Sequence, residues 1–114
     1  DLSELAIDYI QSYFAKPDVS LTTVAAYLGI SSSYLSSLFS KRQGVPLKKY
    51  LQQYRLQQAE KLVRETNFPI SEVAALTGFS DSNYFIKLFK QTYHYTPYRY
   101  RQLAETGGES EVVY

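Results

Sequence analysis

The chain has 114 residues, of which 45% are hydrophobic and none is cysteine. It can therefore form one globular domain or two very small ones, but no disulfide and no thiolate metal site. No apolar run reaches the roughly 18 residues that a membrane-spanning helix needs, and the lack of cysteine fits a reducing compartment such as the cytoplasm. The net charge of +1 conceals a basic middle, because residues 31–101 carry 11 bases against four acids whereas both ends are acidic. This distribution favours a polyanionic partner over an unevenly charged solvated surface only if a further motif supports it.

The first predicted element is an amphipathic helix from Leu2 to Phe14, where apolar residues recur at positions i, i+3, i+4 and i+7. Pro17 ends it, because proline cannot continue the hydrogen-bond ladder and restricts the residue before it. The outer face of this helix is acidic, so we expect a structural brace and not a contact surface.

A pair of helices joined by a tight turn is predicted next. Ser20 is a suitable N-cap for a helix that ends at Gly29, where a left-handed turn costs glycine little. Ser31 to Ser33 can cap the following helix, which Gly44 and Pro46 end. The side chains expected to face inward are Tyr34, Leu35, Leu38 and Phe39, whereas Ser40 and the serines before it lie outside.

A long helix is predicted from Leu47 to Glu65. At about 1.5 Å per residue it spans roughly 28 Å. For Arg55 and Arg64 we expect ion pairs with Glu60 or Glu65.

The stretch from Val73 to Phe89 repeats the stretch from Val24 to Phe39. The first helix of each pair matches at an offset of 49 residues and the second at 50, so the second turn is one residue longer. Asp81 or Ser80 is the expected cap, and Gly78 the tight turn. Inward positions of the second copy are Tyr84, Phe85, Leu88 and Phe89. A last short helix starts with Thr96 as cap and Pro97 in its first turn.

The expected organisation follows from these elements. Residues 1–46 form a first helix-turn-helix subdomain, residues 47–65 a linking helix, residues 66–102 a second helix-turn-helix subdomain, and residues 103–114 a flexible tail.

Two helix-turn-helix motifs in one chain predict double-stranded DNA as the partner, because the second helix of such a motif enters the major groove with a polar outer face. Successive major grooves on one face of DNA lie about 34 Å apart, so the long helix of roughly 28 Å plus the helix widths is of the right order to span them. Imperfect spacing would bend the DNA at a cost of a few kcal/mol. The expected base-reading residues are Ser32, Ser33, Ser36 and Ser37 in the first copy and Ser82, Asn83, Ile86 and Lys87 in the second. Asparagine pairs adenine, lysine favours guanine and isoleucine packs on thymine methyl groups, so we expect more base discrimination from the second copy. Asn83 can alternatively cap its helix.

Phosphate contacts are expected from side chains at helix ends and on the last helix. These are Lys41, Arg42, Lys90, Gln91, Tyr98, Arg99 and Arg101. A helical protein-interaction module without DNA reading is the alternative. One histidine and no cysteine supply no catalytic or metal-binding set, so we expect neither an enzyme nor a cofactor.

The sequence from Leu5 to Gln102 resembles the DNA-binding region of the AraC/XylS family of bacterial transcription regulators. The resemblance lies in L-G-I-S-S-S-Y-L-S-S-L-F with Gly44, in R-L-Q-Q-A-E-K-L-V, and in I-S-E-V-A-A-L-T-G-F-S-D-S-N-Y-F-I-K-L-F-K with T-P-Y-R-Y-R. It implies an all-α fold of seven helices, in which two helix-turn-helix subdomains joined by a long central helix enter two successive major grooves.

The resemblance also implies partners and one departure. Regulators of this kind usually carry an N-terminal sensing or dimerisation domain and, where they activate, contact RNA polymerase. The family usually has glycine where this chain has His94, so His94 must either hold a left-handed conformation or change the turn locally.

Overall fold

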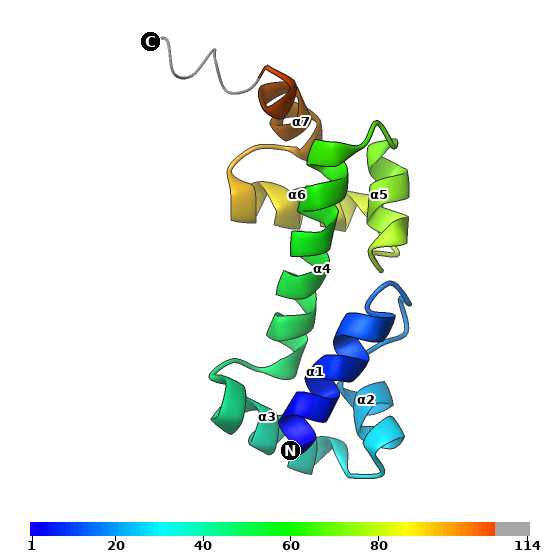
Figure 1. Ribbon diagram of the computed structural model, residues 1–114, viewed down its shortest axis with the longest axis vertical. Helices are drawn as coiled ribbons and strands as arrows, with labels where there is room; N and C mark the ends of the chain where they lie inside the picture. The colour runs from blue at the N-terminus through cyan, green and yellow to red at the C-terminus, as the bar shows by residue number, and fades with distance from the viewer. Residues whose placement is uncertain (107–114) are drawn as a thin grey trace. The chain divides into compact units, whose positions relative to one another are not determined.

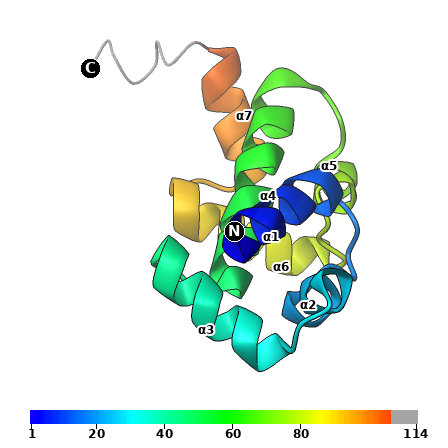
Figure 2. The same cartoon turned by 60° about the horizontal axis from the view of Figure 1, so that its bottom comes forward.

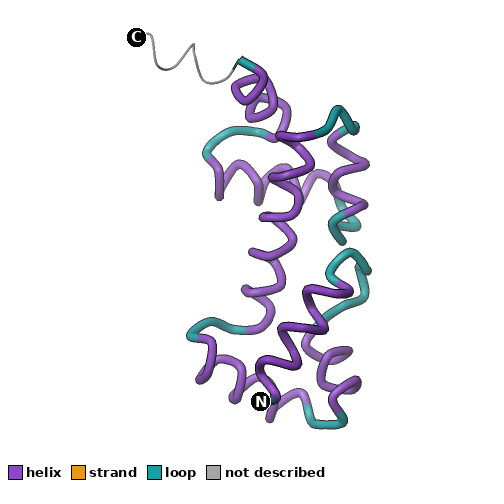
Figure 3. The backbone as a smooth tube through the Cα atoms, in the orientation of Figure 1, coloured by secondary structure: helices purple, strands orange, loops and turns teal. Residues whose placement is uncertain are grey.

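The computed structural model describes residues 1–106, and this part of the chain forms seven α-helices and no β-strand (Figure 1, Figure 3). The predicted all-α fold is therefore confirmed. The helices are α1 (Leu2–Tyr13), α2 (Leu21–Leu28), α3 (Ser32–Gln43), α4 (Leu47–Glu65), α5 (Ile70–Leu76), α6 (Ser82–Tyr93) and α7 (Pro97–Glu105). The long helix has the predicted bounds, whereas α7 continues three residues past the expected boundary at Gln102. The rest of the predicted tail, residues 107–114, lies outside the described residues.

The chain divides into two compact units, and the division falls between Arg55 and Leu56, inside α4. The sequence-based division treated all of α4 as a separate link. In the structure, Leu47 and Leu51 belong to the core of the N-terminal unit, and Leu56 and Ala59 belong to the core of the C-terminal unit. Each half of α4 is thus an integral part of one unit. No helix in the described range is both long and apolar enough to cross a membrane.

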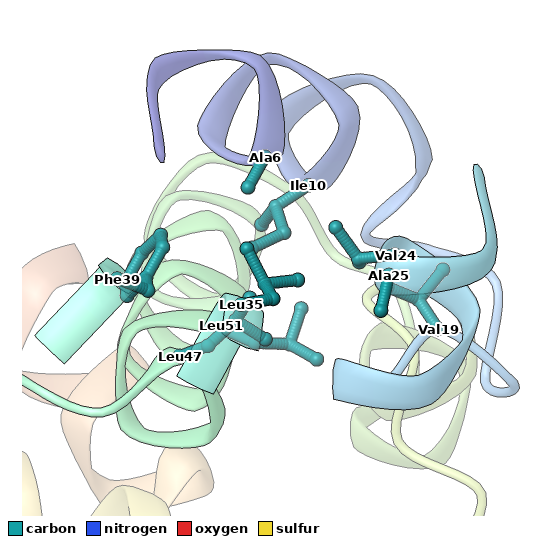
Figure 4. Packing of buried hydrophobic residues seen from close by; sticks show 9 residues of the cluster. All are labelled: Ala6, Ile10, Val19, Val24, Ala25, Leu35, Phe39, Leu47 and Leu51. Atoms are coloured by element: carbon teal, nitrogen blue, oxygen red, sulfur yellow. The ribbon is translucent and has the colours of Figure 1, made fainter. Parts of the chain in front are cut away.

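The core of the N-terminal unit gathers side chains from α1, α2, α3 and the first turns of α4, which point toward one another in Figure 4. Ile10, Val24, Leu35 and Phe39 are fully buried. The ring of Tyr50 packs edge-on against Phe39, with 5.6 Å between the ring centroids. Burial of this apolar surface is the main force that holds α3 in place.

The core of the C-terminal unit is more aromatic. Phe85 and Phe89 are fully buried, and Phe79 packs against Phe85 with 5.0 Å between ring centroids. Tyr100 of α7 lies edge-on against Phe89 at 5.3 Å. The core thus joins α6 to the second half of α4, to α5 and to α7.

The internal repeat is longer than the two helix pairs in which the sequence showed it. Tyr50 on α4 and Tyr100 on α7 are 50 residues apart and pack in the same way on Phe39 and Phe89. At the other end of the repeat, Ile10 of α1 and Ala59 of α4 are 49 residues apart and both fully buried. The first half of α4 therefore corresponds to α7, and its second half corresponds to α1.

Two arginines close helix ends by binding main-chain carbonyls. Arg55 donates from Nε to the carbonyl of Phe14 at 2.9 Å and from Nη2 to that of Lys16 at 2.8 Å. Arg101 donates from Nε to the carbonyl of Val63 at 2.8 Å. The last carbonyls of a helix have no partner within it, so the bonds to Phe14 and Val63 satisfy carbonyls at the ends of α1 and α4, while the bond to Lys16 holds the loop after α1.

The ion-pair prediction was correct for Arg64 and wrong for Arg55. Arg64 contacts both oxygens of Glu60, at 2.8 and 3.2 Å, and one oxygen of Glu65 at 3.0 Å. These residues are neighbours on one helix at spacings of one and four. Arg55 instead faces the end of α1, which is about 40 residues away in sequence and is brought close only by folding.

Candidate nucleic-acid interface

Both predicted turns are present and close in the same way. Gly29 has a φ of 72°, and the N–H of Ile30 donates to the carbonyl of Ala25 at 3.0 Å. The chain then turns from α2 into α3, as Figure 2 shows. Gly78 has a φ of 91°, and the N–H of Phe79 donates to the carbonyl of Ala74 at 2.9 Å. This six-residue closure is the Schellman ending of a helix. The tight turn predicted at Gly78 is therefore confirmed.

The additional residue of the second turn is Ser80. Ser31 caps α3 by accepting a hydrogen bond from the N–H of Tyr34 at 3.1 Å. Asp81 caps α6 by accepting from the N–H groups of Asn83 and Tyr84 at 2.9 and 3.3 Å. The turn closures are 49 residues apart and the caps 50 apart, so one residue is inserted between Phe79 and Asp81. Asp81 is the cap, which leaves the side chain of Asn83 free of that task.

The predicted base-reading residues differ in exposure. Ser33, Ser36 and Ser37 of α3 are exposed, whereas Ser32 is half-buried. On α6, Asn83 and Lys87 are exposed. Ser82 and Ile86 are half-buried, and Ile86 also packs against the core of the C-terminal unit. Each helix thus has a polar outer face opposite its buried residues.

Two tyrosines predicted to face inward do not. Tyr34 is 55% exposed and Tyr84 is 48% exposed. The fully buried positions of these helices are Leu35 with Phe39 and Phe85 with Phe89, which lie four residues apart on a narrow stripe. A residue just before the stripe lies about 100° away around the helix. Both rings are therefore on the flank of the helix, between its core side and its outer face.

Most of the predicted phosphate-contacting residues are accessible. Lys41 and Arg42 lie in the last turn of α3, and Arg42 approaches Asp1 at 3.4 Å with its side chain 59% exposed. Lys90 and Gln91 are exposed near the end of α6, and Tyr98 and Arg99 are exposed in the first turn of α7.

Arg101 departs from this pattern, and the phosphate contact predicted for it is not supported by its position. Its side chain is half-buried and donates to Val63 at the end of α4, and one terminal nitrogen of its guanidinium is buried. It faces the fold because α7 packs against α4, which the local sequence of α7 does not reveal.

Lys48 and Lys49 were missed by the sequence reasoning. Both are exposed in the first turn of α4, and they stand 50 residues before Tyr98 and Arg99. Continuing the offset of 50 past Gly44 and Pro46 would have found them. The repeat therefore places Lys48 and Lys49 after α3 and, at the equivalent positions, Tyr98 and Arg99 after α6.

His94 takes the left-handed conformation, which is the first of the two alternatives predicted. Its φ and ψ are 74° and −5°, and its N–H donates to the carbonyl of Lys90 at 2.8 Å. Gly44 has nearly the same angles, 77° and −1°, and donates to Ser40 at 2.9 Å. Both second helices thus end with one geometry. Among the described residues, no cluster of three or more His, Asp or Glu side chains is placed to hold a metal ion.

Comparisons with known proteins agree with this geometry. Residues 24–103 match a family model described as a helix-turn-helix domain. The regulatory protein PocR of Salmonella typhimurium is 36% identical over 97 residues, which cover 85% of this chain and 32% of PocR. This chain thus spans about a third of that relative's length.

Two solved structures extend the comparison to the fold. The C-terminal domain of the two-component response regulator yesN from Fusobacterium nucleatum is similar with a TM-score of 0.83 and 38% identity, over 86% of this chain and 95% of that one. A transcriptional regulator from Chromobacterium violaceum, of the AraC-type DNA-binding domain-containing proteins, is similar with a TM-score of 0.77 and 26% identity. That match covers 87% of this chain and 88% of the other.

Proposed function

This chain belongs to the helix-turn-helix family of AraC-type DNA-binding domains found in transcription regulators, and on that premise we propose how it reads DNA. The helices α3 and α6 each enter the major groove of double-stranded DNA, in two successive grooves. The domain then serves as the DNA-binding part of a longer transcription regulator.

The observation that carries the proposal is the duplication of one surface. In both units a helix with a polar outer face follows a Schellman turn, begins at a side-chain cap and ends at a left-handed residue. A single such helix pair is common in helical proteins. Two copies with buried anchors at matching positions, each with a polar face turned outward, match the requirement of two groove-reading helices.

The two copies contribute differently to base reading in this proposal. On α6, Asn83 and Lys87 are exposed and offer the side-chain types that pair adenine and guanine in the major groove. The exposed part of Ile86 can contact a thymine methyl group, while its buried part holds the helix. On α3, Ser33, Ser36 and Ser37 present only short hydroxyls, which bond many base edges or water. We therefore assign most of the direct base discrimination to α6.

The remaining exposed polar side chains are assigned to the DNA backbone. They are Lys41, Arg42, Lys48, Lys49, Lys90, Gln91, Tyr98 and Arg99. Contacts of this kind position a protein without reading sequence, and those made by cations weaken as salt rises because they release counterions.

The longer relatives suggest the context. PocR is about three times as long as the segment that matches it, so we propose that a sensing or dimerisation domain accompanies this domain in the full-length regulator. RNA polymerase would be the second partner where the regulator activates transcription. Such a protein works in the bacterial cytoplasm, where the chromosome is.

The proposal is tested by selecting bound sequences from a random double-stranded library with the whole chain. The expected result is an enriched motif that extends over about two helical turns, with affinity that falls as salt rises. A shuffled version of the enriched sequence is the control. If the selected and shuffled duplexes bound equally, the domain would not read sequence. If neither bound, the helical surfaces would serve protein contacts instead.

A further inference from the structure

Three tyrosines form a contiguous surface on α1 and α2, which lie side by side in the N-terminal unit (Figure 1, Figure 2). The ring centroids of Tyr9 and Tyr13 are 4.8 Å apart, and those of Tyr9 and Tyr27 are 4.6 Å apart. Tyr27 is 67% exposed and Tyr13 is 41% exposed. Leu5 is exposed and continues the row of Tyr9 and Tyr13 at the same four-residue spacing. We call these four residues the tyrosine cluster.

Two acids border the tyrosine cluster on its solvent side. Glu4 and Asp8 are exposed and four residues apart, so they form a second row on α1, about 100° around the helix from Leu5 and Tyr9. Within residues 1–106 neither carboxylate makes an ion pair or a side-chain hydrogen bond. Two negative charges without a partner in the fold therefore stand beside exposed aromatic rings.

One cation of the chain already contacts the tyrosine cluster. The Nζ atom of Lys16 lies 5.1 Å from the centroid of the Tyr13 ring, which is within the range of a cation–π contact. The ring of Tyr27 is more exposed and has no such cation in the described part of the chain. The cluster thus attracts a cation to one of its rings and leaves another ring open to a second cation.

The C-terminal unit has no equivalent of this surface. The repeat relates the two units at an offset of 49 residues here, as it relates Ile10 to Ala59. The counterparts of the three tyrosines and the two acids include no aromatic residue and no acid, and they are Gln53, Gln57, Gln58, Leu62 and Leu76. A requirement of the fold or of groove reading would apply to both units. The tyrosine cluster therefore serves a purpose that belongs to the N-terminal unit alone.

We propose that the tyrosine cluster is a docking surface for another protein, which presents arginine or lysine side chains beside apolar ones. The cationic groups lie over the ring of Tyr27 and beside Glu4 and Asp8, and the apolar groups pack on Leu5. Nucleic acid is not the occupant, because the carboxylates repel its phosphates. No residue of α3 takes part, so this protein contact is additional to the proposed DNA reading. It gives α1 more than the bracing role predicted from the sequence.

The test selects binders from a library of random peptides displayed on phage, with the whole chain as the target. An enriched peptide is synthesised, and its affinity is measured for the unaltered chain, Tyr27→Ala and Asp8→Asn, each across a salt series. Tyr98→Ala and Glu105→Gln are the matched controls on α7, because Tyr98 is 64% exposed and Glu105 is an exposed acid. Circular dichroism and binding to the selected duplex are measured for every variant.

The expected result is enrichment of peptides that combine arginine or lysine with apolar residues and bind more weakly as salt rises. Tyr27→Ala lowers the peptide affinity by about 5- to 30-fold, because an aromatic anchor and its cation contact are lost. Asp8→Asn lowers it by about 2- to 5-fold and reduces its salt dependence. Both variants stay folded and bind the duplex as the unaltered chain does. Tyr98→Ala does the reverse, since it weakens duplex binding and leaves peptide binding unchanged, and Glu105→Gln changes neither.

Several outcomes would overturn the inference while the proposed function stands. They are the absence of any enriched peptide, enrichment without an excess of basic residues, and equal peptide binding by the unaltered chain and Tyr27→Ala. A loss of peptide affinity in Tyr98→Ala as large as that in Tyr27→Ala would also overturn it, because binding would not be confined to the tyrosine cluster. If folded Tyr27→Ala lost duplex binding, the cluster would belong to the DNA surface instead. Failure of the unaltered chain to bind any duplex would refute the proposed function alone, since peptide docking does not require it.

Discussion

The substitution Tyr100→Phe removes one hydroxyl at the point where α7 is attached to α4. The phenol of Tyr100 donates to Oε2 of Glu60 at 2.7 Å, across 40 residues of sequence. The ring itself packs edge-on against Phe89 and is kept by phenylalanine. Because α7 also carries Tyr98 and Arg99, this bond connects the stability of the C-terminal unit to the proposed DNA contacts.

The magnitude follows from the surroundings of Glu60. A hydrogen bond to a charged group contributes about 1.5–3 kcal/mol. Glu60 keeps its two contacts with Arg64 in the variant, and its side chain is 16% exposed, so water can partly replace the lost donor. The expected loss in the free energy of unfolding is therefore near the lower bound, about 1.5 kcal/mol. For a domain of this size each kcal/mol lowers the melting temperature by roughly 4–8 °C.

This loss in the free energy of unfolding depends on pH, because both Glu60 and Tyr100 can ionise. The hydrogen bond from Arg64, with a smaller contribution from Tyr100, lowers the pKa of Glu60. A lowered carboxyl pKa stabilises the fold above the ordinary glutamate pKa, and the stabilisation is lost as the pH falls through the folded-state value. The difference between the unaltered chain and Tyr100→Phe should therefore shrink in acid. Burial, followed by the bond to Glu60, raises the pKa of Tyr100 to about 12. The stability that the protonated phenol contributes is therefore fully present below the ordinary tyrosine pKa of 10.0 and is lost as the pH rises through about 12.

Thermal unfolding followed by circular dichroism measures the loss, and native-state hydrogen exchange locates it in the C-terminal unit. Tyr50→Phe is the matched control, because Tyr50 occupies the same repeat position but only accepts a 3.3 Å bond from Gln11 at an exposed site. It should cost no more than a few tenths of a kcal/mol. Equal losses for Tyr50→Phe and Tyr100→Phe, or a loss independent of pH between 3 and 7, would refute the reasoning.

The remaining predictions concern the left-handed residues of the turns and the side chains proposed to contact DNA. Gly44→Ala should destabilise the N-terminal unit by about 1 kcal/mol in urea unfolding because its φ is 77°, although the added Cβ has no atom within 4 Å beyond those of the adjoining residues. His94→Gly should stabilise the C-terminal unit by a similar amount, and no gain would argue against strain at His94. Gly78→Val should cost about 1–3 kcal/mol, because a β-branched residue is strained at a φ of 91°, and an unchanged melting curve would contradict this. Lys87→Ala should cost about 1–3 kcal/mol on the selected duplex and little on the shuffled one, whereas Lys90→Ala should weaken both and reduce the salt slope by about 1. Equal effects of Lys87→Ala on both duplexes would remove its base-reading role.

Much of the local structure was predictable because its causes are local. The ends of α4, the turn at Gly78 and a cap at Ser80 or Asp81 depend on residues within a few positions of one another, through periodicity, side-chain caps and the conformational freedom of glycine. The structure selects Asp81 as the cap. The change of offset between the two copies, from 49 to 50 residues, was visible in the sequence. The structure identifies Ser80 as the inserted residue that causes it. The alignment of His94 with Gly44 left two alternatives open, and the structure shows the left-handed one.

The sequence by itself thus determined the helices, their caps and the repeated motif, since each depends on neighbours along the chain. Only the tertiary structure decided which half of α4 belongs to which unit, that Arg55 and Arg101 bind main-chain carbonyls at helix ends, and that Tyr34 lies on an exposed flank. These features depend on groups about 40 residues apart or on the angular width of a buried stripe. Helical periodicity alone does not specify either, because it identifies a face but not what packs against it.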